Sequence, residues 1–521
     1  MKIYSYNKTI ITAVVLLFSA TADAQRNYGI ATGDWSSINS LYLNPANIAD
    51  SRERFSISLF SITAGADNNL GSIGNSGLIS SLANGNTKFN YSNNNQFSLL
   101  APFAEVRGPG CVISINDKHS IALTTGIRGI NQFNNFNQAL YRTITDPNYS
   151  TGNNIDLTSN KFNYTAHLWS EIGLSYGGVI YDKGHNEIKA GVTLRYLGGI
   201  GYVGLKGNNL DAHFRSGNDS FYASNSDIEY ASNVLSTRSA LVNGFSNQSI
   251  LSQFFGTKSG HGMGGDIGVT YDYIPEPTKD RYDMDGKTGL ADGSKNRYLL
   301  RVSASVVDIG AITYNSSNNS NATVTGNGYL TGNGLLNNVR SFTDFSNYAV
   351  AQGFHADTAH ANTKVYMPTT LLLSIDYHAY KQLYVNAAFA GNLANRQNFG
   401  NSYYNQITIT PRYDTRLLSV GLPITYSMLS NSVKLGVGVR ASGFFIGSDD
   451  MLALFAGHQY GFNFYVGGSV PFYKKKIKDR DGDGVSDRKD KCPDEYGPWE
   501  NRGCPVKDAD DAKEKGQDKE E

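Results

Sequence analysis

Apolar and polar residues alternate with a period of two along most of this chain. Residues 418–426 place Leu, Val, Leu, Ile and Tyr at every second position, and residues 433–439 repeat the pattern after a short turn. Residues 373–379 and 383–389 form a second such pair. This alternation predicts strands with one apolar face, joined as antiparallel hairpins. The period of an α-helix is nowhere sustained, so we predict an all-β fold.

The lengths of the alternating segments and of their connections favour a membrane barrel. Many segments run for about ten residues, the length that a tilted strand needs to cross a bilayer. Short turns alternate with long segments rich in Asn, Gly and Ser, at residues 67–96, 206–260 and 315–362. Soluble sandwiches instead place turn signals roughly every 8–12 residues. We predict a transmembrane antiparallel β-barrel of about 14 strands, with a secreted sandwich or propeller as the alternative.

The last alternating segment predicts where the barrel ends. It places apolar residues or Gly at every second position and is followed by Lys474, Lys475 and Lys476; the alternating residues are Phe462, Phe464, Val466, Gly468, Val470 and Phe472. This ending resembles the terminal strand by which outer-membrane barrels are recognised for insertion. We therefore predict that the barrel domain covers residues 25–473 and closes near Phe472.

The first 24 residues predict export. Lys2 and Lys8 accompany an apolar stretch over residues 9–20, and Ala22-Asp23-Ala24 offers small residues for cleavage before Gln25. The apolar stretch is too short to cross a bilayer as a helix. We predict a signal peptide over residues 1–24 and localisation in the cell outer membrane.

The amino-acid composition supports a fold of strands and argues against some classes of function. The chain holds 55 Gly, 33 Tyr and 25 Phe but only 13 Pro, a mixture that suits sheets. Its formal net charge is zero and no basic stripe is present, which argues against nucleic acid as a partner. The nine His are scattered without metal-ligand spacing. We expect no enzyme.

An acidic run after the barrel has the spacing of a calcium loop. Its carboxylates fall at positions 1, 3, 5, 9 and 12 of a twelve-residue loop, with Gly484 at position 6, where the chain must turn sharply. Alternate side chains can then point at one ion, and a hard cation prefers oxygen ligands. We predict calcium as the cofactor, bound by Asp479, Asp481, Asp483, the Val485 carbonyl, Asp487 and Asp490. A solvated acidic linker is the alternative. The shorter Asp283-Met284-Asp285-Gly286 is interpreted as a turn between two strands.

Two of the three cysteines, Cys492 and Cys504, flank a short loop beyond the acidic run. We predict a disulfide between them, and we interpret Cys111 as a buried or membrane-facing apolar residue. Residues 479–505 resemble a thrombospondin type 3 repeat, whose Asp-rich loops wrap calcium around almost no core. We assign residues 474–505 to a calcium-binding module in the periplasm and residues 506–521 to a disordered charged tail.

Asn44-Pro45-Ala46 resembles a motif near the start of the FadL-like outer-membrane transporters, which implies that residues 25–50 plug the lumen; Asn-Pro also opens ordinary turns. Other stretches add a resemblance to an uncharacterised family of Bacteroidota outer-membrane barrels: Gly108-Pro109-Gly110, residues 116–120, 169–173, 308–312, 436–440 and 447–450. Members of that family, a domain of unknown function, often carry a thrombospondin-like linker and an OmpA-like peptidoglycan-binding domain. Only residues 505–521 follow Cys504 here, so we do not expect direct peptidoglycan binding.

Three functions fit these predictions. The first is a non-enzymatic structural or assembly component of the envelope, whose calcium-rigidified module meets an envelope protein complex or a separate peptidoglycan-binding protein. The second is a FadL-like channel for small hydrophobic or amphiphilic solutes. The third is an accessory subunit of an outer-membrane secretion or assembly machine. In each case outer-membrane lipid surrounds the barrel, and the strands do not identify a solute.

Overall fold

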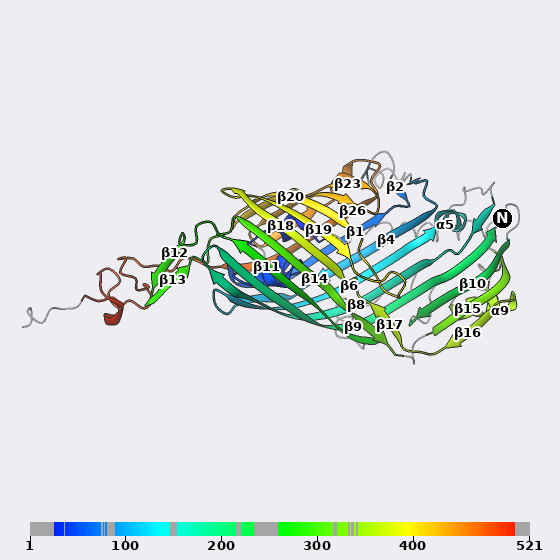
Figure 1. Cartoon of the computed structure of the whole chain (residues 1–521), viewed down its shortest axis with the longest axis horizontal. Helices are drawn as coiled ribbons and strands as arrows, with labels where there is room; N and C mark the ends of the chain where they lie inside the picture. Colours follow the sequence, from blue (N-terminus) through cyan, green and yellow to red (C-terminus); the bar gives the residue numbers. More distant parts are fainter. Residues whose placement is uncertain are drawn as a thin grey trace, which may run out of the picture.

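The computed structural model describes residues 26–505 with gaps at 36, 74–76, 78, 81–88, 146–153, 215–219, 234–258, 316–319, 332–333, 335–337 and 340–341. These residues form a closed antiparallel barrel of 14 strands, in agreement with the predicted fold class and strand number (Figure 1). The predicted signal peptide and the predicted tail over residues 506–521 lie outside the described residues.

The strands of the barrel follow one another around the wall in chain order. Four of them are interrupted and carry two labels each. Their bounds are β1 (Glu53–Asn68), β4 and β5 (Gln96–Arg107, Gly110–Ser114), β6 (His119–Asn137), β8 (Phe162–Lys183), β9 (Asn186–Phe214), β11 (Gly260–Tyr273), β14 (Leu300–Tyr314), β17 and β18 (Thr363–Tyr366, Thr370–Tyr380), β19 (Leu383–Asn392), β20 (Gln406–Asp414), β21 and β22 (Leu418–Gly421, Ile424–Ser427), β23 and β24 (Ser432–Leu435, Val437–Ala441), β25 (Phe444–Ser448) and β26 (Gly461–Tyr473).

The first and last strands close the barrel. β1 pairs with β26 along almost its whole length, and Phe55 stands opposite Phe472. The predicted closure near Phe472 is therefore confirmed. The predicted hairpin over residues 373–389 is also present, as β18 and β19, with Lys381 in the left-handed conformation that its tight turn requires.

The outer face of the wall is apolar, because the alternate residues that point away from the lumen are large and hydrophobic. On β18 and β19, for example, Leu373, Ile375, Tyr377 and Val385 are each at least 38% exposed. An unpaired backbone edge cannot exist in lipid, and this wall has none because it closes on itself. A closed antiparallel barrel with such a face is a barrel of the outer-membrane type.

The two ends of the barrel differ. Tight turns gather at one end, which also carries the hairpin of β12 (Arg281–Met284) and β13 (Lys287–Ala291) and the C-terminal residues 474–505 (Figure 1). We call this the module end. Long connections gather at the other, the loop end, together with the small strands β2 (Gly71–Ile73) and β3 (Phe89–Tyr91).

Part of the sequence expected as long loops is instead a folded extension of the sheet at the loop end. β9 runs on beyond the barrel and pairs with β10 (Ser220–Ser232), which pairs with β15 (Ser320–Thr331), which pairs with β16 (His355–Ala359). β7 (Ile155–Leu157), α5 (Gln138–Thr145) and α9 (Phe342–Ala351) complete it around an apolar core. Strands outside a bilayer need no apolar outer face, so their polar sequence was mistaken for loop.

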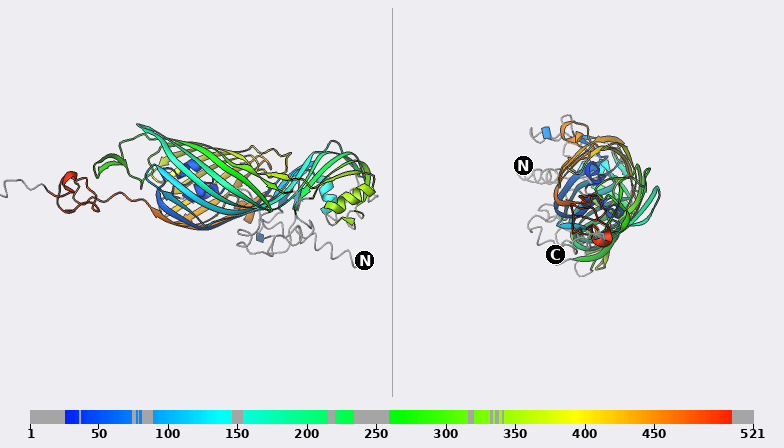
Figure 2. Two further views of the ribbon diagram at one scale, coloured as in Figure 1. Left: turned by 90° about the horizontal axis from the view of Figure 1, so that it is seen from below. Right: turned by 90° about the vertical axis from the view of Figure 1, so that its left-hand side faces the viewer.

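The N-terminal residues 26–50 lie inside the barrel, as the resemblance to the plugged transporters implied. They form α2 (Tyr28–Ala31), α3 (Ser37–Ser40) and the 3-10 turn η1 (Pro45–Ile48) and take no part in the sheet. The end-on view in Figure 2 shows these dark blue elements enclosed by the ring of strands. We call residues 26–50 the plug.

The remaining helices are short. α10 (Leu452–Phe455) lies between β25 and β26, and η3 (Trp499–Asn501) lies in the C-terminal module. None of the helices in the described residues has both the length and the apolar character that crossing a bilayer requires.

Candidate functional site

Asn44 of the predicted plug motif ties the plug to the barrel wall. Its Nδ2 donates to the carbonyl of Val269 on β11, at 3.0 Å, and to that of Ala304 on β14, at 3.3 Å. Its Oδ1 accepts from the amide of Ala46 at 2.8 Å, which caps the turn that Pro45 begins. Asn44 therefore has a specific structural role, because its side chain both shapes the turn of the plug and joins the plug to two strands of the wall.

Glycines of the wall let the plug approach closely. A Cβ at Gly177 on β8 would lie 2.7 Å from Ile48, and a Cβ at Gly191 on β9 would overlap the backbones of Pro45 and Ala46. On the opposite part of the wall, a Cβ at Gly438 would lie 2.7 Å from Gly29. The wall is thus hollowed where the plug meets it.

Carboxylates of the wall hold the other half of the plug. Asp449 accepts hydrogen bonds from the amides of Tyr28 and Gly29 at 2.9 and 3.1 Å, and from the Tyr465 hydroxyl at 3.0 Å. Asp414 on β20 accepts from the amide of Asp34 at 2.9 Å. Backbone N–H groups that have no strand partner are satisfied in this way by inward side chains.

A second segment closes the lumen from the loop end. Residues 393–405, between β19 and β20, reach across to β6 and β8, which lie on the far side of the ring. Gln132 exchanges two hydrogen bonds with Ser402, at 2.6 and 2.8 Å, and Asn163 donates to the carbonyl of Asn398 at 2.8 Å. Tyr403 and neighbouring aromatic rings join an apolar cluster that fills this part of the barrel. We call residues 393–405 the inward loop.

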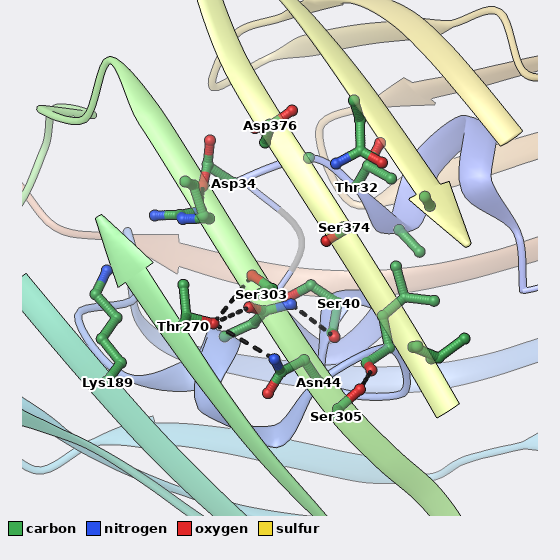
Figure 3. Close-up of a pocket in the computed structure, with 18 of the residues that line it drawn as sticks. Thr32, Asp34, Ser40, Asn44, Lys189, Thr270, Ser303, Ser305, Ser374 and Asp376 are labelled. Carbon is green, nitrogen blue, oxygen red and sulfur yellow. Dashed lines mark hydrogen bonds and ion pairs between the residues drawn. The ribbon is translucent and has the colours of Figure 1, made fainter. Parts of the chain in front are cut away.

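A cavity remains between the plug and the wall formed by β11, β14, β18 and β19. The empty space there amounts to about 840 Å³, a figure that counts space open to solvent, so the cavity is not closed off from water. Figure 3 shows hydroxyl and amide side chains converging on it from both sides. The wall contributes Thr270, Ser303, Ser305, Ser374, Asp376 and Asn386, and the plug contributes Asp34, Ser40, Asn44 and Asn47.

Charged groups at the cavity pair with one another. Arg301 contacts Asp34 at 2.5 Å and Asp272 at 2.7 Å, and Lys189 contacts Asp272 at 2.9 Å. Asp376 accepts a two-pronged contact from Arg412 at 2.5 and 2.7 Å. The cavity therefore has a charged rim whose ions are already compensated.

A further buried network fills the middle of the lumen. The guanidinium of Arg128 lies 3.0 Å from Glu105, 3.2 Å from Glu171 and 2.7 Å from Asp308. Arg195 shares Asp308 at 2.6 Å. Such groups cross-brace distant strands, and each charge needs its partners because water is largely excluded.

The predicted calcium loop brings three of its carboxylates together. Asp479, Asp481 and Asp483 offer oxygens that all lie within 4.8 Å of one another, and this group does not include Asp487 or Asp490. Asp481 Oδ2 and Asp487 Oδ1 are buried and have no hydrogen-bond partner among the described residues. Burial and the neighbouring carboxylates raise the pKa of Asp481. This oxygen-rich arrangement suits a divalent cation, and the ligand set remains a prediction.

The module rests on the hairpin of β12 and β13. The amide of Ser486 donates to Asp285 at 2.9 Å, the amide of Asp285 donates to the carbonyl of Gly484 at 2.7 Å, and Lys489 lies 3.0 Å from the Asp285 carboxylate. Gly286, in the hairpin turn, packs against Trp499. The turn predicted over residues 283–286 is present at Asp285 and Gly286, while residues 283 and 284 end β12. The sequence did not indicate that this turn receives the module.

The cysteines take the expected places. Cys492 and Cys504 form a disulfide. Cys111 lies on β5 opposite Ile57 and Leu123, both outward and exposed, so it faces the membrane side of the wall. Our interpretation that the chain holds no nucleophile-elbow pattern Gly-x-Ser-x-Gly is wrong, because Gly173-Leu174-Ser175-Tyr176-Gly177 matches it. These residues lie inside β8, where Ser175 bonds Thr193 at 2.8 Å, and no strand-to-helix turn exposes the hydroxyl.

Comparison with known proteins gives a family without an assigned function. Residues 45–449 match the family described as a family of unknown function, DUF5723. No curated protein matches the chain.

Several solved barrels are similar in structure at low identity. A FadL homologue from Pseudomonas aeruginosa is 12% identical with a TM-score of 0.38, over 87% of this chain and 99% of that chain. A deltaS2 mutant of the TodX monoaromatic hydrocarbon channel is 9% identical with a TM-score of 0.42, over 87% of this chain and 100% of that chain. The fold assignment rests on the strand pairing of this chain itself.

Proposed function

The chain belongs to the DUF5723 family, and from its geometry we propose that it is a non-enzymatic outer-membrane barrel that passes a small solute when its plug yields. The observation that carries this proposal is that residues 26–50 fill the lumen without joining the sheet. A segment held only by side chains and close packing can move without breaking a strand of the wall.

The inward loop supports the same function. It closes the loop end through side-chain hydrogen bonds such as those of Gln132 and Asn163, through a backbone hydrogen bond from Tyr366 to Phe399, and through its aromatic rings. With both closures in place no open aqueous pore is expected, so passage would require a rearrangement at the plug, at the inward loop, or at both.

Permeability of proteoliposomes tests this function. We expect wild-type protein to leak little, deletion of residues 26–50 to raise the flux of small solutes strongly, and Asn44→Ala to raise it less. Asn94→Ala is the matched control, because this exposed Asn donates to Asn69 at the loop end, far from the plug. If the deletion variant inserts, keeps the heat-resistant mobility of a folded barrel and shows wild-type flux, the proposal is wrong.

A second function is favoured by the contact between the module and the hairpin. We propose that residues 474–505 lie in the periplasm, bind calcium through the predicted ligands, and present a stiff surface to an envelope protein complex or a separate peptidoglycan-binding protein. The support is the contact at Asp285 together with the unpartnered oxygens of Asp481 and Asp487. Calcium would neutralise carboxylates that otherwise repel one another in a segment with little core.

Calorimetry on the full chain tests the calcium site. Saturable binding in the range of extracellular loops, about 10⁻⁴–10⁻³ M, should be lost in Asp481→Ala and kept in Asp494→Ala, an exposed carboxylate paired with Arg480. Equal binding by both variants would contradict the assignment. Cross-linking in native membranes, with and without a chelator, would then show whether a partner depends on the loaded module.

A further inference from the structure

The cavity between the plug and the wall has a lining that indicates the kind of molecule it holds. We propose that it binds a small, neutral, polyhydroxylated solute of about the size of one sugar unit, rather than the hydrophobic solute that a FadL-like channel implies. This assignment names the solute class of the proposed passage and rests on that function for its purpose. Binding itself requires no passage and is measured separately.

Three hydroxyls form a row across three neighbouring strands. Thr270 on β11 stands opposite Ser303 on β14, and Ser303 stands opposite Ser374 on β18. All three point into the cavity in Figure 3. The row is about as wide as two strand spacings, roughly 10 Å. Thr270 and Ser303 bond each other at 3.2 Å, and Thr270 also donates to Asn47 and accepts from Asn44 of the plug, each at 3.4 Å. Of the three hydroxyls, that of Ser374 therefore remains open to a ligand.

Two polar groups at the cavity lack partners in the protein. The Oδ1 of Asn386, a residue only 5% exposed, accepts no hydrogen bond from the described residues. No hydrogen bond joins the Ser374 hydroxyl to a described residue either. A buried acceptor without a partner is costly, and a ligand that donates a hydrogen bond would satisfy it. The buried Oδ1 of Asn386 and the partly exposed hydroxyl of Ser374 are therefore both available to a ligand in the cavity.

The charges around the cavity indicate a neutral ligand. Arg301 and Lys189 contact Asp34 and Asp272, and Asp376 contacts Arg412, so each ion at the rim is compensated. An added anion or cation would have to displace one of these contacts. A neutral molecule with several hydroxyls needs no such exchange.

An apolar solute would fit this lining poorly. It would leave the Ser374 hydroxyl and the Oδ1 of Asn386 without partners, whereas Thr270 and Ser303 already bond each other at 3.2 Å. A site built for hydrogen bonding rejects analogues that lack the bonding groups in this way. Each lost hydrogen bond corresponds to a weakening of about tenfold. Leu43, Leu372 and Leu373 also line the cavity, but the polar groups without partners favour a polyol over a hydrocarbon.

Binding of D-glucose and of toluene to the full-length protein in nanodiscs tests this inference. We expect saturable glucose binding in the millimolar range, weakened about tenfold in Ser374→Ala and in Asn386→Ala. Because neither changed group has a partner in the protein, the unfolding midpoint should stay at the wild-type value. Thr124→Val is the matched control, since Thr124 is a buried hydroxyl on β6 that does not line the cavity.

The outcomes separate the two proposals. No saturable glucose binding, tighter binding of toluene than of glucose, or equal glucose binding by the wild type and both cavity variants would each overturn the assignment of the ligand. Glucose binding that is weakened in the cavity variants, in a protein whose plug deletion changes no flux, would support the site and overturn only the passage.

Discussion

The plug and the C-terminal module are both small, irregular pieces attached to one barrel, but different forces hold them. The plug lies against glycines of the wall, where Gly191 leaves no room for a side chain, and Asn44 joins it to two strands. The module has no enclosing wall. Among residues 474–505, Val485 is the buried apolar side chain, and a disulfide, carboxylates and Asp285 supply the rest.

This difference shows how an irregular segment becomes ordered. Inside the barrel, water is excluded and packing space is fixed, so shape and buried hydrogen bonds determine the position of the plug. Outside it, a segment too small for a core depends on covalent and charge-based links. Substitutions that disturb the interior of the barrel should therefore destabilise the whole barrel, whereas substitutions in the module should destabilise the module alone.

Among these substitutions, Arg128→Met in the barrel should cause the largest loss of stability. The change leaves Glu105, Glu171 and Asp308 beside one another without their shared cation. We expect a loss of about 3–5 kcal/mol in the free energy of unfolding, measured from the urea dependence of the heat-modifiable gel mobility. Arg480→Met, which removes an exposed pair in the module, should leave the midpoint unchanged. Similar midpoints for both variants would refute the contrast.

Gly191→Ala tests the packing of the plug directly. The new Cβ would overlap the backbones of Pro45 and Ala46, so the plug must shift or leave. We expect a loss of about 3 kcal/mol and faster tryptic cleavage at Arg52. Gly129→Ala is the control, because its Cβ would meet only the Leu168 side chain, at 3.3 Å. Unchanged cleavage at Arg52 would show that the plug is not fixed by the wall.

The strands of the barrel could be predicted from sequence because the alternation within each strand shows which of its side chains point outward. Lipid demands an apolar residue at every outward position, so alternation at residues 373–379 or 462–472 identifies a strand without knowledge of its partners. The extension at the loop end has no such requirement. Its strands, such as β10 and β15, were therefore missed.

The site was less accessible to prediction. The resemblance at Asn44 suggested a plug, but which wall residues meet it depends on registers that alternation does not give. The row of Thr270, Ser303 and Ser374 joins three strands that are far apart in sequence, and no local pattern brings them together. One signal was available in the sequence. Thr270, Ser303 and Ser374 are small polar residues at inward positions, where the barrel itself requires no particular side chain.

The double substitution Cys492→Ser with Cys504→Ser tests whether the disulfide stabilises the module alone. Removing the cross-link restores conformational freedom to the loop between two cysteines that are 12 positions apart, which should cost the module about 2–3 kcal/mol. We expect faster hydrogen exchange over residues 479–505 and no change in the unfolding midpoint of the barrel. Cys111→Ala, on the membrane side of β5, controls for loss of a thiol. A shift of the barrel midpoint in the double variant would mean that the two regions fold as one unit.

Asp285→Asn should have the smallest effect and tests the link between the two regions. Burial opposes its charge, but the Ser486 amide and the Lys489 ammonium outweigh this and hold the pKa of Asp285 below its ordinary value of 3.8. The contact should therefore be complete at neutral pH and be lost only as the pH falls below 3.8. Because Asp285 is only partly buried and its partner Lys489 is exposed, we expect the Asn variant to lose only about 1 kcal/mol.

The readout is the hydrogen-exchange rate of the Ser486 amide, which donates to Asp285 and should exchange about tenfold faster in the variant. Asp283→Asn is the control in the same hairpin, since Asp283 accepts from the Gly289 amide within the hairpin and contacts no described residue of the module. Equal exchange at Ser486 in the two variants would show that the module is held elsewhere. In that case the hairpin would be a neighbour of the module and not its support.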